Sequence, residues 1–327
     1  MRQKRVVIIG GGTGTSMVLK SLIDFPHHLS AVISTMDDGG SSGRLLTELG
    51  VHTAPGDIRL CLLALSKADP ALRALLGYRF AEGDLMGHTV GNLLLAAAEK
   101  TFGDFAEGLK LVHTILEVQG EVIPVTLERT TLSVRHGVEQ TVIRGEHVID
   151  DCRALNRPRT FFLEPRAAAN PKAMEAIKNA DVLILGPGSI STSLIPVLIV
   201  EGVQEAIKES RAKIIFNANL TTTPGQNDGQ TIWEMSRELE SYLGKSIDVI
   251  VYQDQPFPPD LLASIEVGGA PTVLGQPLPE QHAEAIGADL LLKTVIKGML
   301  GDPIIRKKIS HDTKRLGIIL SDLIYRL

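Results

Sequence analysis

The sequence is poor in the residues that mark disulfide-rich, zinc-stabilised and nucleic-acid-binding proteins. Only two of its 327 residues are cysteine, Cys61 and Cys152, and they do not form a CxxC pair. A disulfide framework is therefore excluded, and both cysteines are expected to be free. Lys and Arg number 33 against 38 Asp and Glu, a formal net charge of −5. A nucleic-acid partner, which normally requires a basic surface, is not expected.

Long apolar runs are missing as well. The run behind the basic N-terminus covers only residues 6–9, which is too short for the hydrophobic part of a signal peptide. The longest run, 194–200, is interrupted by Pro196 and cannot span a bilayer. We therefore expect a cytoplasmic protein without membrane insertion.

What the sequence does contain is a set of glycine-rich turns, each directly after a short apolar run. Residues 10–14 (Gly-Gly-Gly-Thr-Gly) follow the run 6–9, and residues 37–44 (Asp-Asp-Gly-Gly-Ser-Ser-Gly-Arg) follow the run 31–36. A strand that ends in glycines and opens a helix leaves backbone N–H groups unpaired, and the helix dipole adds partial positive charge there. Both turns therefore predict phosphate binding.

The first turn is an incomplete dinucleotide-binding fingerprint. Gly10 and Gly12 fit its spacing, but Thr15 stands where a third glycine is expected. Asp37 lies 27 positions after Gly10, whereas the ribose-binding acid normally follows at about 20 positions. A tight turn that feeds a packed helix is therefore the alternative interpretation of this segment.

The second turn adds charged side chains. One of the adjacent acids Asp37 and Asp38 could accept sugar or ribose hydroxyls, and the other could hold a divalent cation or accept a proton. The alternative is that at least one of them caps the glycine turn. Arg44 could bind a phosphate through both of its terminal nitrogens, or pair with Glu48 one turn further along a helix.

Two further segments carry polar residues at the start of an expected helix. Asp57 and Arg59 form an acid–base pair next to a turn, although Asp57 could simply be a helix N-cap. His88 and Asn92 are four residues apart and could donate hydrogen bonds to a base or sugar. A buried His88 bonded to a backbone carbonyl is the alternative.

A third strand-to-helix junction lies in the second half of the chain. Residues 186–189 (Gly-Pro-Gly-Ser) follow the run 182–185, and hydroxyl-bearing residues open the next helix. The following strand ends in the polar segment 217–219 and a loop rich in threonine. Glycine-rich or polar junctions at the ends of successive strands predict one common ligand site. The candidate ligand-binding residues are Gly11, Gly12, Thr13, Gly14, Thr15, Asp37, Asp38, Gly39, Gly40, Ser41, Ser42, Arg44, Asp57, Arg59, His88, Asn92, Gly186, Gly188, Ser189, Thr192, Asn219 and Thr223.

Strand and helix signals alternate along the chain, which predicts one α/β domain over 1–327 with a Rossmann-like, mainly parallel, doubly wound sheet. Parallel strands are expected at 6–9, 31–36, 181–185, 213–216 and 247–252, and helices at 171–179, 231–243 and 312–325, among others. Between 110 and 165 the apolar period changes to alternation, which predicts a small antiparallel β insertion with strands at 122–125, 131–135, 141–145 and 160–163. Segments 254–259 and 267–279 are expected to be surface loops or a lid.

The motifs stand in an order that resembles a known family. They are Gly-Gly-Gly-Thr-Gly (10–14), Asp-Asp-Gly-Gly-Ser-Ser-Gly-Arg-Leu (37–45), Pro-Gly-Asp-Ile-Arg (55–59), Gly-His-x-x-Gly-Asn (87–92), Gly-Pro-Gly-Ser (186–189) and Thr-x-Pro-Gly-x-x-Asp-Gly (222–229). The set is similar to the bacterial gluconeogenesis factor family (YvcK-like), which is related in fold to the 2-phospho-L-lactate transferases (CofD-like).

The resemblance implies a CofD-like fold and a cytoplasmic regulator needed for normal cell shape and for growth on gluconeogenic carbon sources. It also implies binding of a UDP-sugar such as UDP-N-acetylglucosamine, with no assigned reaction, no catalytic residue and no certain cofactor. Mg²⁺, a homo-oligomer and a regulatory protein partner stay open. The alternative is a magnesium-dependent transferase of phosphoryl or nucleotidyl groups. The transferase relatives carry a Pro-Asp-Leu-Asp type of stretch where this chain has 55–59, so Arg59 replaces an acid and favours an anion over a metal.

Overall fold

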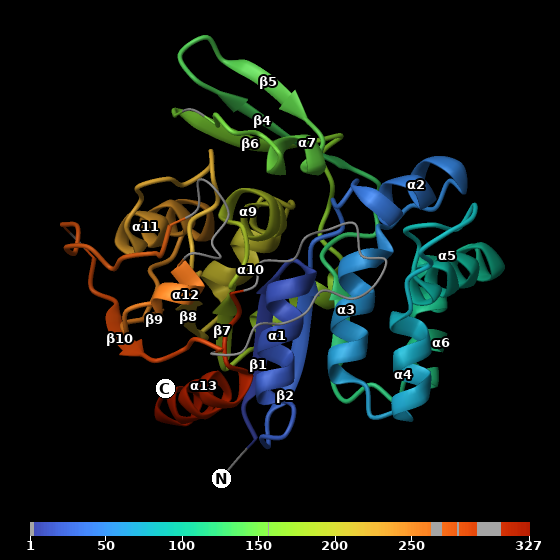
Figure 1. The fold of residues 1–327 in the computed structure, drawn as a ribbon, viewed down its shortest axis with the longest axis horizontal. Helices are drawn as coiled ribbons and strands as arrows, with labels where there is room; N and C mark the ends of the chain where they lie inside the picture. Colours follow the sequence, from blue (N-terminus) through green and yellow to red (C-terminus); the bar gives the residue numbers. More distant parts are fainter. Residues whose placement is uncertain (1–2, 156, 263–269, 280, 293–308) are drawn as a thin grey trace.

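The computed structural model describes residues 3–155, 157–262, 270–279, 281–292 and 309–327. Within these residues, seven parallel strands form a sheet in the order β10-β9-β8-β7-β1-β2-β3 (Figure 1). The strands are β1 (Arg5–Gly10), β2 (His28–Ile33), β3 (Glu121–Pro124), β7 (Val182–Leu185), β8 (Lys213–Asn217), β9 (Val249–Gln253) and β10 (Glu284–Ala288). β1 pairs with β2 on one side and β7 on the other, so the strand order reverses there. The predicted α/β class with a mainly parallel sheet is confirmed.

The strands are apolar along their whole length because helices cover both faces of the sheet. In β1, Val6 and Ile8 pack into one hydrophobic cluster, and Val7 and Ile9 pack into a second cluster on the opposite face. All four side chains are at most 2% exposed. Such continuous runs are typical of parallel strands that are buried on both sides.

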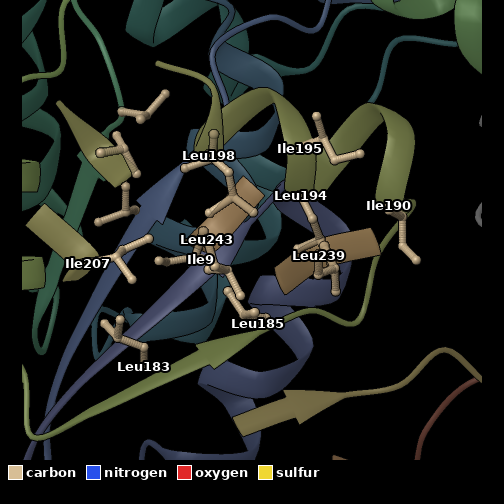
Figure 2. Close-up of a cluster of buried hydrophobic side chains, with 14 of the residues drawn as sticks. Ile9, Leu183, Leu185, Ile190, Leu194, Ile195, Leu198, Ile207, Leu239 and Leu243 are labelled. Atoms are coloured by element: carbon tan, nitrogen blue, oxygen red, sulfur yellow. The ribbon is translucent and has the colours of Figure 1, made fainter. Parts of the chain in front are cut away.

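One face carries the helices nearer to the N-terminus together with the last helix. These are α1 (Gly12–Leu22), α3 (Pro55–Leu65), α4 (Pro70–Gly77), α5 (Val90–Phe102), α6 (Phe105–Ile115) and α13 (Thr313–Arg326). The other face carries α8 (Pro171–Lys178), the π-helical turn η1 (Ile190–Leu194), α9 (Ile195–Leu198), α10 (Val203–Glu209) and α11 (Ile232–Leu243). Figure 2 shows part of this second cluster, in which Ile9 and Leu185 of the sheet lie among Leu194, Leu239 and Leu243.

A separate antiparallel sheet lies beyond the carboxyl ends of the parallel strands, at the top of Figure 1. It consists of β4 (Thr131–His136), β5 (Thr141–Arg144) and β6 (Arg159–Glu164) in the order β5-β4-β6, and the short helix α7 (Glu146–Asp150) follows β5. The predicted insertion is wrong in its first part. Residues 121–124 form β3, which pairs with β2 in parallel, because a short apolar run does not reveal which sheet it joins.

Other elements differ from the prediction at their ends or were not foreseen. β2 begins and ends three residues before the expected strand 31–36, and the helix α2 (Gly40–Glu48) follows the turn behind it. β10 was not foreseen, because Glu-Ala-Ile-Gly-Ala is weakly apolar. In the predicted loop 267–279, residues 267–269 lie outside the described residues, and 270–279 contain an isolated bridge between Thr221 and Pro271. The short helix α12 (Pro259–Leu262) follows the first predicted loop.

Two smaller expectations concern cysteines and membranes. Cys61 is buried, Cys152 is half-buried, and both are free, as predicted. Over the described parts of the chain, every helix is too short or too polar to cross a membrane.

The packing of α13 on α1 generates a first prediction. A Cβ atom at Gly317 would lie 2.1 Å from the carbonyl oxygen of Ser21. We expect Gly317→Ala to lower the free energy of unfolding by about 1–3 kcal/mol, because the added methyl group forces the two helices apart. The control is Ile318→Ala on the same helix, where the side chain is 57% exposed and the change should stay within about 0.5 kcal/mol. Helix propensity alone would make Gly317→Ala stabilising. Urea denaturation that shows such a gain would contradict the close packing.

Candidate functional site

The predicted glycine turns meet at the carboxyl ends of β1, β2 and β7. The closeness of the backbone shows this directly, because a Cβ atom at Gly14 would lie 1.7 Å from the carbonyl oxygen of Pro187. A Cβ atom at Gly12 would lie 2.3 Å from Oδ1 of Asp57, and one at Gly11 would lie 2.9 Å from Oγ of Ser193. Side chains at these positions would push the segments apart, so glycine is required for the turns to meet.

Three helices begin at this edge of the sheet. Their N-cap residues are Gly11 (α1), Gly39 (α2) and Ala54 (α3), and none of the three makes a capping hydrogen bond with its own side chain. The three helix starts are close together, because a Cβ atom at Gly56 of α3 would lie 2.8 Å from Oγ of Ser42 in α2. Three dipole ends at one place create a positive potential that suits an anion.

Carboxyl groups lie against these helix starts. Asp57 of α3 accepts a hydrogen bond from the Gly12 N–H, and burial together with the charge of Asp37 raises the pKa of Asp57 from 3.8 to about 7. Burial also raises the pKa of Asp37, although hydrogen bonds from Ser42 and the Gly39 N–H oppose the shift. In Glu146 of α7, burial and the nearby Asp37 carboxylate raise the pKa well above its ordinary value. These three carboxyl groups therefore hold protons more readily than free ones do.

Two side chains that were predicted at the ligand make other contacts. Both carboxylate oxygens of Asp38 accept backbone hydrogen bonds at the start of α7, from Glu146 N at 3.2 Å and His147 N at 2.8 Å. Asp38 therefore caps α7, a role that the sequence did not suggest. Asp37 accepts the Gly39 N–H at 3.0 Å and so caps the glycine turn, which is the alternative that the sequence left open. Arg44 pairs with Glu48 at 3.2 Å and donates hydrogen bonds to carbonyl oxygens of residues 84 and 86. Arg44 therefore attaches the loop that contains residues 84 and 86 to α2.

His88 and Asn92 are part of a buried polar network that joins α2, α3 and α5. The hydroxyl group of Ser41 is 2.9 Å from Nδ1 of His88 and accepts a hydrogen bond from Nδ2 of Asn92 at 3.0 Å. Nε of Arg59 donates to Oδ1 of Asn92 at 2.8 Å. His88, Arg59 and Asn92 are at most 6% exposed, and burial lowers the pKa of His88. The partner of Nδ1 is a serine hydroxyl and not the backbone carbonyl considered above.

The third junction, after β7, is held by side chains from the next loops. Asn219 clamps the peptide of Gly188, accepting its N–H at 2.7 Å and donating to its carbonyl oxygen at 2.8 Å. The hydroxyl group of Ser189 accepts the Thr192 N–H at 3.1 Å and donates to Oε1 of Gln226 at 3.0 Å. The Gly188 amide and the Ser189 hydroxyl therefore have protein partners in this structure.

Sequence reasoning missed Glu146, Asp150 and Gln226 at the site. Asp150 accepts hydrogen bonds at Oδ1 from Thr192 at 3.0 Å and from Gln226 at 3.2 Å, so it joins α7 to the third junction and to the loop 222–229 that contains Thr223. Glu146 and Asp150 stand four residues apart on one turn of a helix, which is an ordinary surface pattern. Their place at the sheet edge depends on the antiparallel sheet and could not be predicted from spacing.

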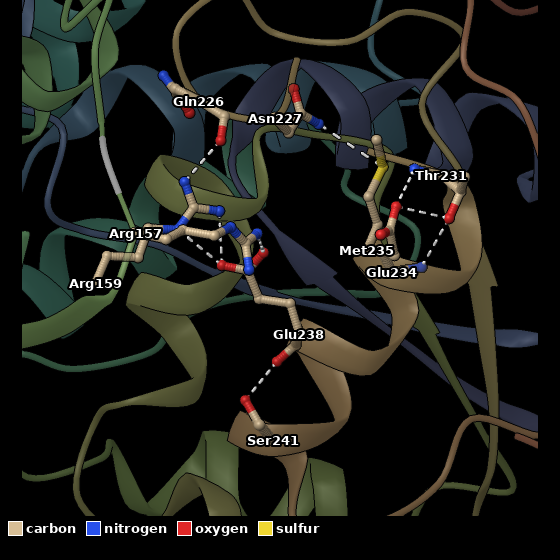
Figure 3. Close-up of polar contacts among 9 residues, drawn as sticks. All are labelled: Arg157, Arg159, Gln226, Asn227, Thr231, Glu234, Met235, Glu238 and Ser241. Carbon is tan, nitrogen blue, oxygen red and sulfur yellow. Dashed lines mark hydrogen bonds and ion pairs between the residues drawn. The ribbon is translucent and has the colours of Figure 1, made fainter. Parts of the chain in front are cut away.

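A buried ion-pair cluster fastens the loop 222–229 from below (Figure 3). The Arg159 guanidinium of β6 contacts Glu238 of α11 at 2.9 and 2.6 Å and donates to the Gln226 carbonyl oxygen at 2.7 Å. Arg157 also contacts Glu238, at 2.6 Å. The side chains of Arg159 and Glu238 are 3% and 9% exposed. The antiparallel sheet is therefore tied to α11, and Arg159 ties it to the loop 222–229 as well.

The remaining candidates lie in the same region. Thr13 is exposed on the first turn of α1, whereas Thr15 behind it is fully buried, with no partner for its hydroxyl group among the described residues. A side chain at Gly40 would meet open space, although its φ of +46° favours glycine. The predicted residues thus lie at one edge of the sheet, although Asp38, Arg44 and His88 serve mainly to hold its segments.

The raised pKa of Asp57 generates a prediction about stability and pH. The folded protein keeps a proton on Asp57 up to about pH 7, whereas the unfolded chain releases it near 3.8, so stability falls as the pH rises between these values. Asp57→Asn removes this loss. As the pH rises from 5 to 7.5, we expect the variant to gain about 1–2 kcal/mol in its free energy of unfolding relative to the natural protein. This is less than the full shift implies, because the neighbouring Asp37 takes part in the same titration.

Urea denaturation at both pH values measures this difference. The control is Ile318→Ala, which replaces an exposed side chain without a titratable group, so that its effect should not change with pH. An equal effect of Asp57→Asn at the two pH values would show that burial does not raise the pKa of Asp57.

Comparisons with known proteins show which families and structures this chain is similar to. Residues 6–291 match the model of the CofD family, described as 2-phospho-L-lactate transferase CofD. A gluconeogenesis factor from Halalkalibacterium halodurans is 40% identical over 258 residues, 77% of this chain and 78% of that one. Another, from Listeria innocua, is 37% identical over 268 residues, 79% of this chain and 80% of that one. The crystal structure of a UPF0052 family member from Bacillus halodurans superposes with a TM-score of 0.88 at 32% identity, covering 98% of this chain and all of the other.

Proposed function

The chain belongs to the CofD family and is similar to gluconeogenesis factors, and from this premise we propose that it binds a nucleotide sugar of the UDP-N-acetylglucosamine type. The site is the carboxyl edge of β1, β2 and β7. Binding serves a regulatory role in the cytoplasm, in which the protein is required for cell shape and for growth under gluconeogenic conditions.

The observation that carries this proposal is the meeting of three helix starts beside glycine turns. A diphosphate carries at least two negative charges, and its oxygens accept several hydrogen bonds in a small volume. The N–H groups at the starts of α1 and α2, with the dipole of α3 behind them, supply both the donors and the partial positive charge. At Gly40, the first residue of α2, a Cβ atom would meet open space, so a phosphate has room to approach the backbone there.

The carboxyl groups at the same edge suit the sugar and ribose hydroxyls. Asp37, Asp57 and Glu146 have raised pKa values, so each accepts a hydroxyl hydrogen bond when charged and donates one when protonated. Their reduced charge also lessens the repulsion of a neighbouring phosphate.

A regulatory role follows from the contacts between the segments around the site. Ser189, Asp150 and Gln226 join three separate stretches of chain by hydrogen bonds at the rim. A ligand that contacts one of these stretches changes the position of the others and of the antiparallel sheet above them. The altered surface is what a protein partner would recognise.

The second candidate function is a magnesium-dependent transferase, because the family model carries the transferase name and acids crowd the site. The fit to a metal is poor in the part of the chain that the structure describes, since no three of its His, Cys, Asp and Glu side chains are arranged to hold an ion. We derive no step through magnesium. Turnover of a nucleotide substrate with a phospholactate-type acceptor and Mg²⁺ would favour this alternative over a purely regulatory role.

A charge at Thr13 tests the proposed site. This exposed residue lies on the first turn of α1, so Thr13→Glu adds a negative charge where the diphosphate should bind. We expect calorimetric titration to show that affinity for UDP-N-acetylglucosamine falls by about tenfold or more, because like charges a few ångströms apart repel by about 1 kcal/mol even in water. Thr13→Gln has the same shape without the charge and should lose much less.

Thr13→Glu should not destabilise the fold, since an acid near a helix N-terminus is favourable. UDP-glucose, GDP and NADP are titrated in parallel to define the ligand class. If none of the four ligands binds at millimolar concentration, the nucleotide-sugar proposal is wrong. Equal affinity in the Glu and Gln variants would place the ligand elsewhere.

A further inference from the structure

A recess of about 320 Å³ lies on the flank of the sheet, between α6 and the edge strand β3. It shares no residue with the candidate site described above. This volume is at the lower end of the range for small-molecule sites. The lining residues come from α6, from β3 and the turn after it, and from the start of α8.

One side of the recess is apolar. Leu109 of α6 and Val122 and Ile123 of β3 are at most 8% exposed, and Leu127, also in the lining, is 38% exposed. β3 is the last strand on this side, so its outer edge has no neighbouring strand among the described residues. The N–H of Val125 bonds inward to Ile33, and backbone groups alternate along a strand, so the N–H and C=O of Val122 point outward.

The other side of the recess is polar and carries two lysines, one histidine and one acid. Half-buried His113 and exposed Lys110 come from α6, and Lys172 comes from the first turn of α8. Lys110 is paired with Glu107 one turn earlier, and the acid in the lining, Glu121, is exposed at the start of β3. A lysine in the first turn of a helix is unfavourable for the helix dipole, so the Lys172 ammonium group does not stabilise α8.

The lining also contains a polar side chain that is fixed by hydrogen bonds. Asn170 is 7% exposed, donates Nδ2 to the Pro124 carbonyl oxygen at 3.1 Å and accepts the Lys172 N–H at 3.1 Å. Its backbone N–H bonds to the Val125 carbonyl oxygen at 2.8 Å. Asn170 thereby holds the start of α8, and with it Lys172, against the end of β3. These hydrogen bonds fix the position of the polar side of the recess.

We propose that this recess binds a small organic anion, a carboxylate with a short apolar chain. The carboxylate lies between Lys172, Lys110 and the His113 ring, and the chain lies against Leu109, Val122 and Leu127. Burial lowers the pKa of His113, so the ring is largely neutral near pH 7 and offers one N–H donor. The inference is independent of nucleotide-sugar binding and adds a second ligand site to the protein.

Hexanoate is the probe, and the full chain is titrated while the ring C–H signals of His113 are followed by NMR. His113→Gln identifies these signals among the nine histidines. We expect saturable shifts of His113 with hexanoate and much smaller ones with hexanol or hexylammonium, which lack the negative charge. Equal shifts with all three probes, or none with hexanoate, would overturn the proposal. A response to inorganic phosphate that exceeds the response to hexanoate would overturn the carboxylate class.

A pair of lysines on the same helix provides the matched control. Lys172→Gln should weaken hexanoate binding about threefold to fivefold, the modest effect of an exposed charge. Lys178→Gln, at the other end of α8 where the side chain pairs with Glu209 at 2.7 Å, should leave it unchanged. Unchanged binding in Lys172→Gln, or equal losses in both variants, would contradict the assignment. Both residues are exposed, so neither substitution threatens the fold.

Discussion

The close approach of three helix starts at one edge of the sheet is the constraint on which the rest of the site depends. Positive dipole ends repel each other, and side chains would keep them apart. Glycine at positions 12 and 56 removes the steric barrier, and the Asp57 carboxyl group against the Gly12 N–H offsets part of the repulsion. The carboxyl groups therefore help the helix starts to approach each other. Because they are buried there, their pKa values are raised. An anionic ligand would take over the role that the carboxyl groups have in its absence.

Two buried polar networks connect this edge to the outer layers. The Ser41, His88, Asn92 and Arg59 network joins α2 to α3 and α5, and the Arg159–Glu238 pair joins the antiparallel sheet to α11 and the loop 222–229. Buried ion pairs contribute little net stability compared with apolar packing, but the loss of one partner leaves a buried charge. Such networks fix relative position more than they add stability. They place the segments that surround the site, whereas the two hydrophobic clusters hold the sheet itself.

Much of the fold follows from local sequence patterns. The apolar runs 6–9 and 182–185 are too short and too continuous for amphipathic helices, and the glycines after them mark the strand ends. Since the carboxyl ends of parallel strands meet at one edge, the sequence also predicted that the glycine turns come together. It could not assign 122–125 to the main sheet, because the sequence of an edge strand does not indicate which strand it pairs with.

By itself, then, the sequence determined the fold class, the glycine turns and the edge at which they gather, because these depend on backbone freedom and apolar period. Only the tertiary structure decided what each polar side chain does there. Asp38 caps α7 and Arg44 holds a loop, whereas Glu146 reaches the site from a segment that spacing could not connect to it. The physical reason is that a hydrogen bond depends on direction and distance in space. These are set by how the sheets and helices pack over long separations in the chain.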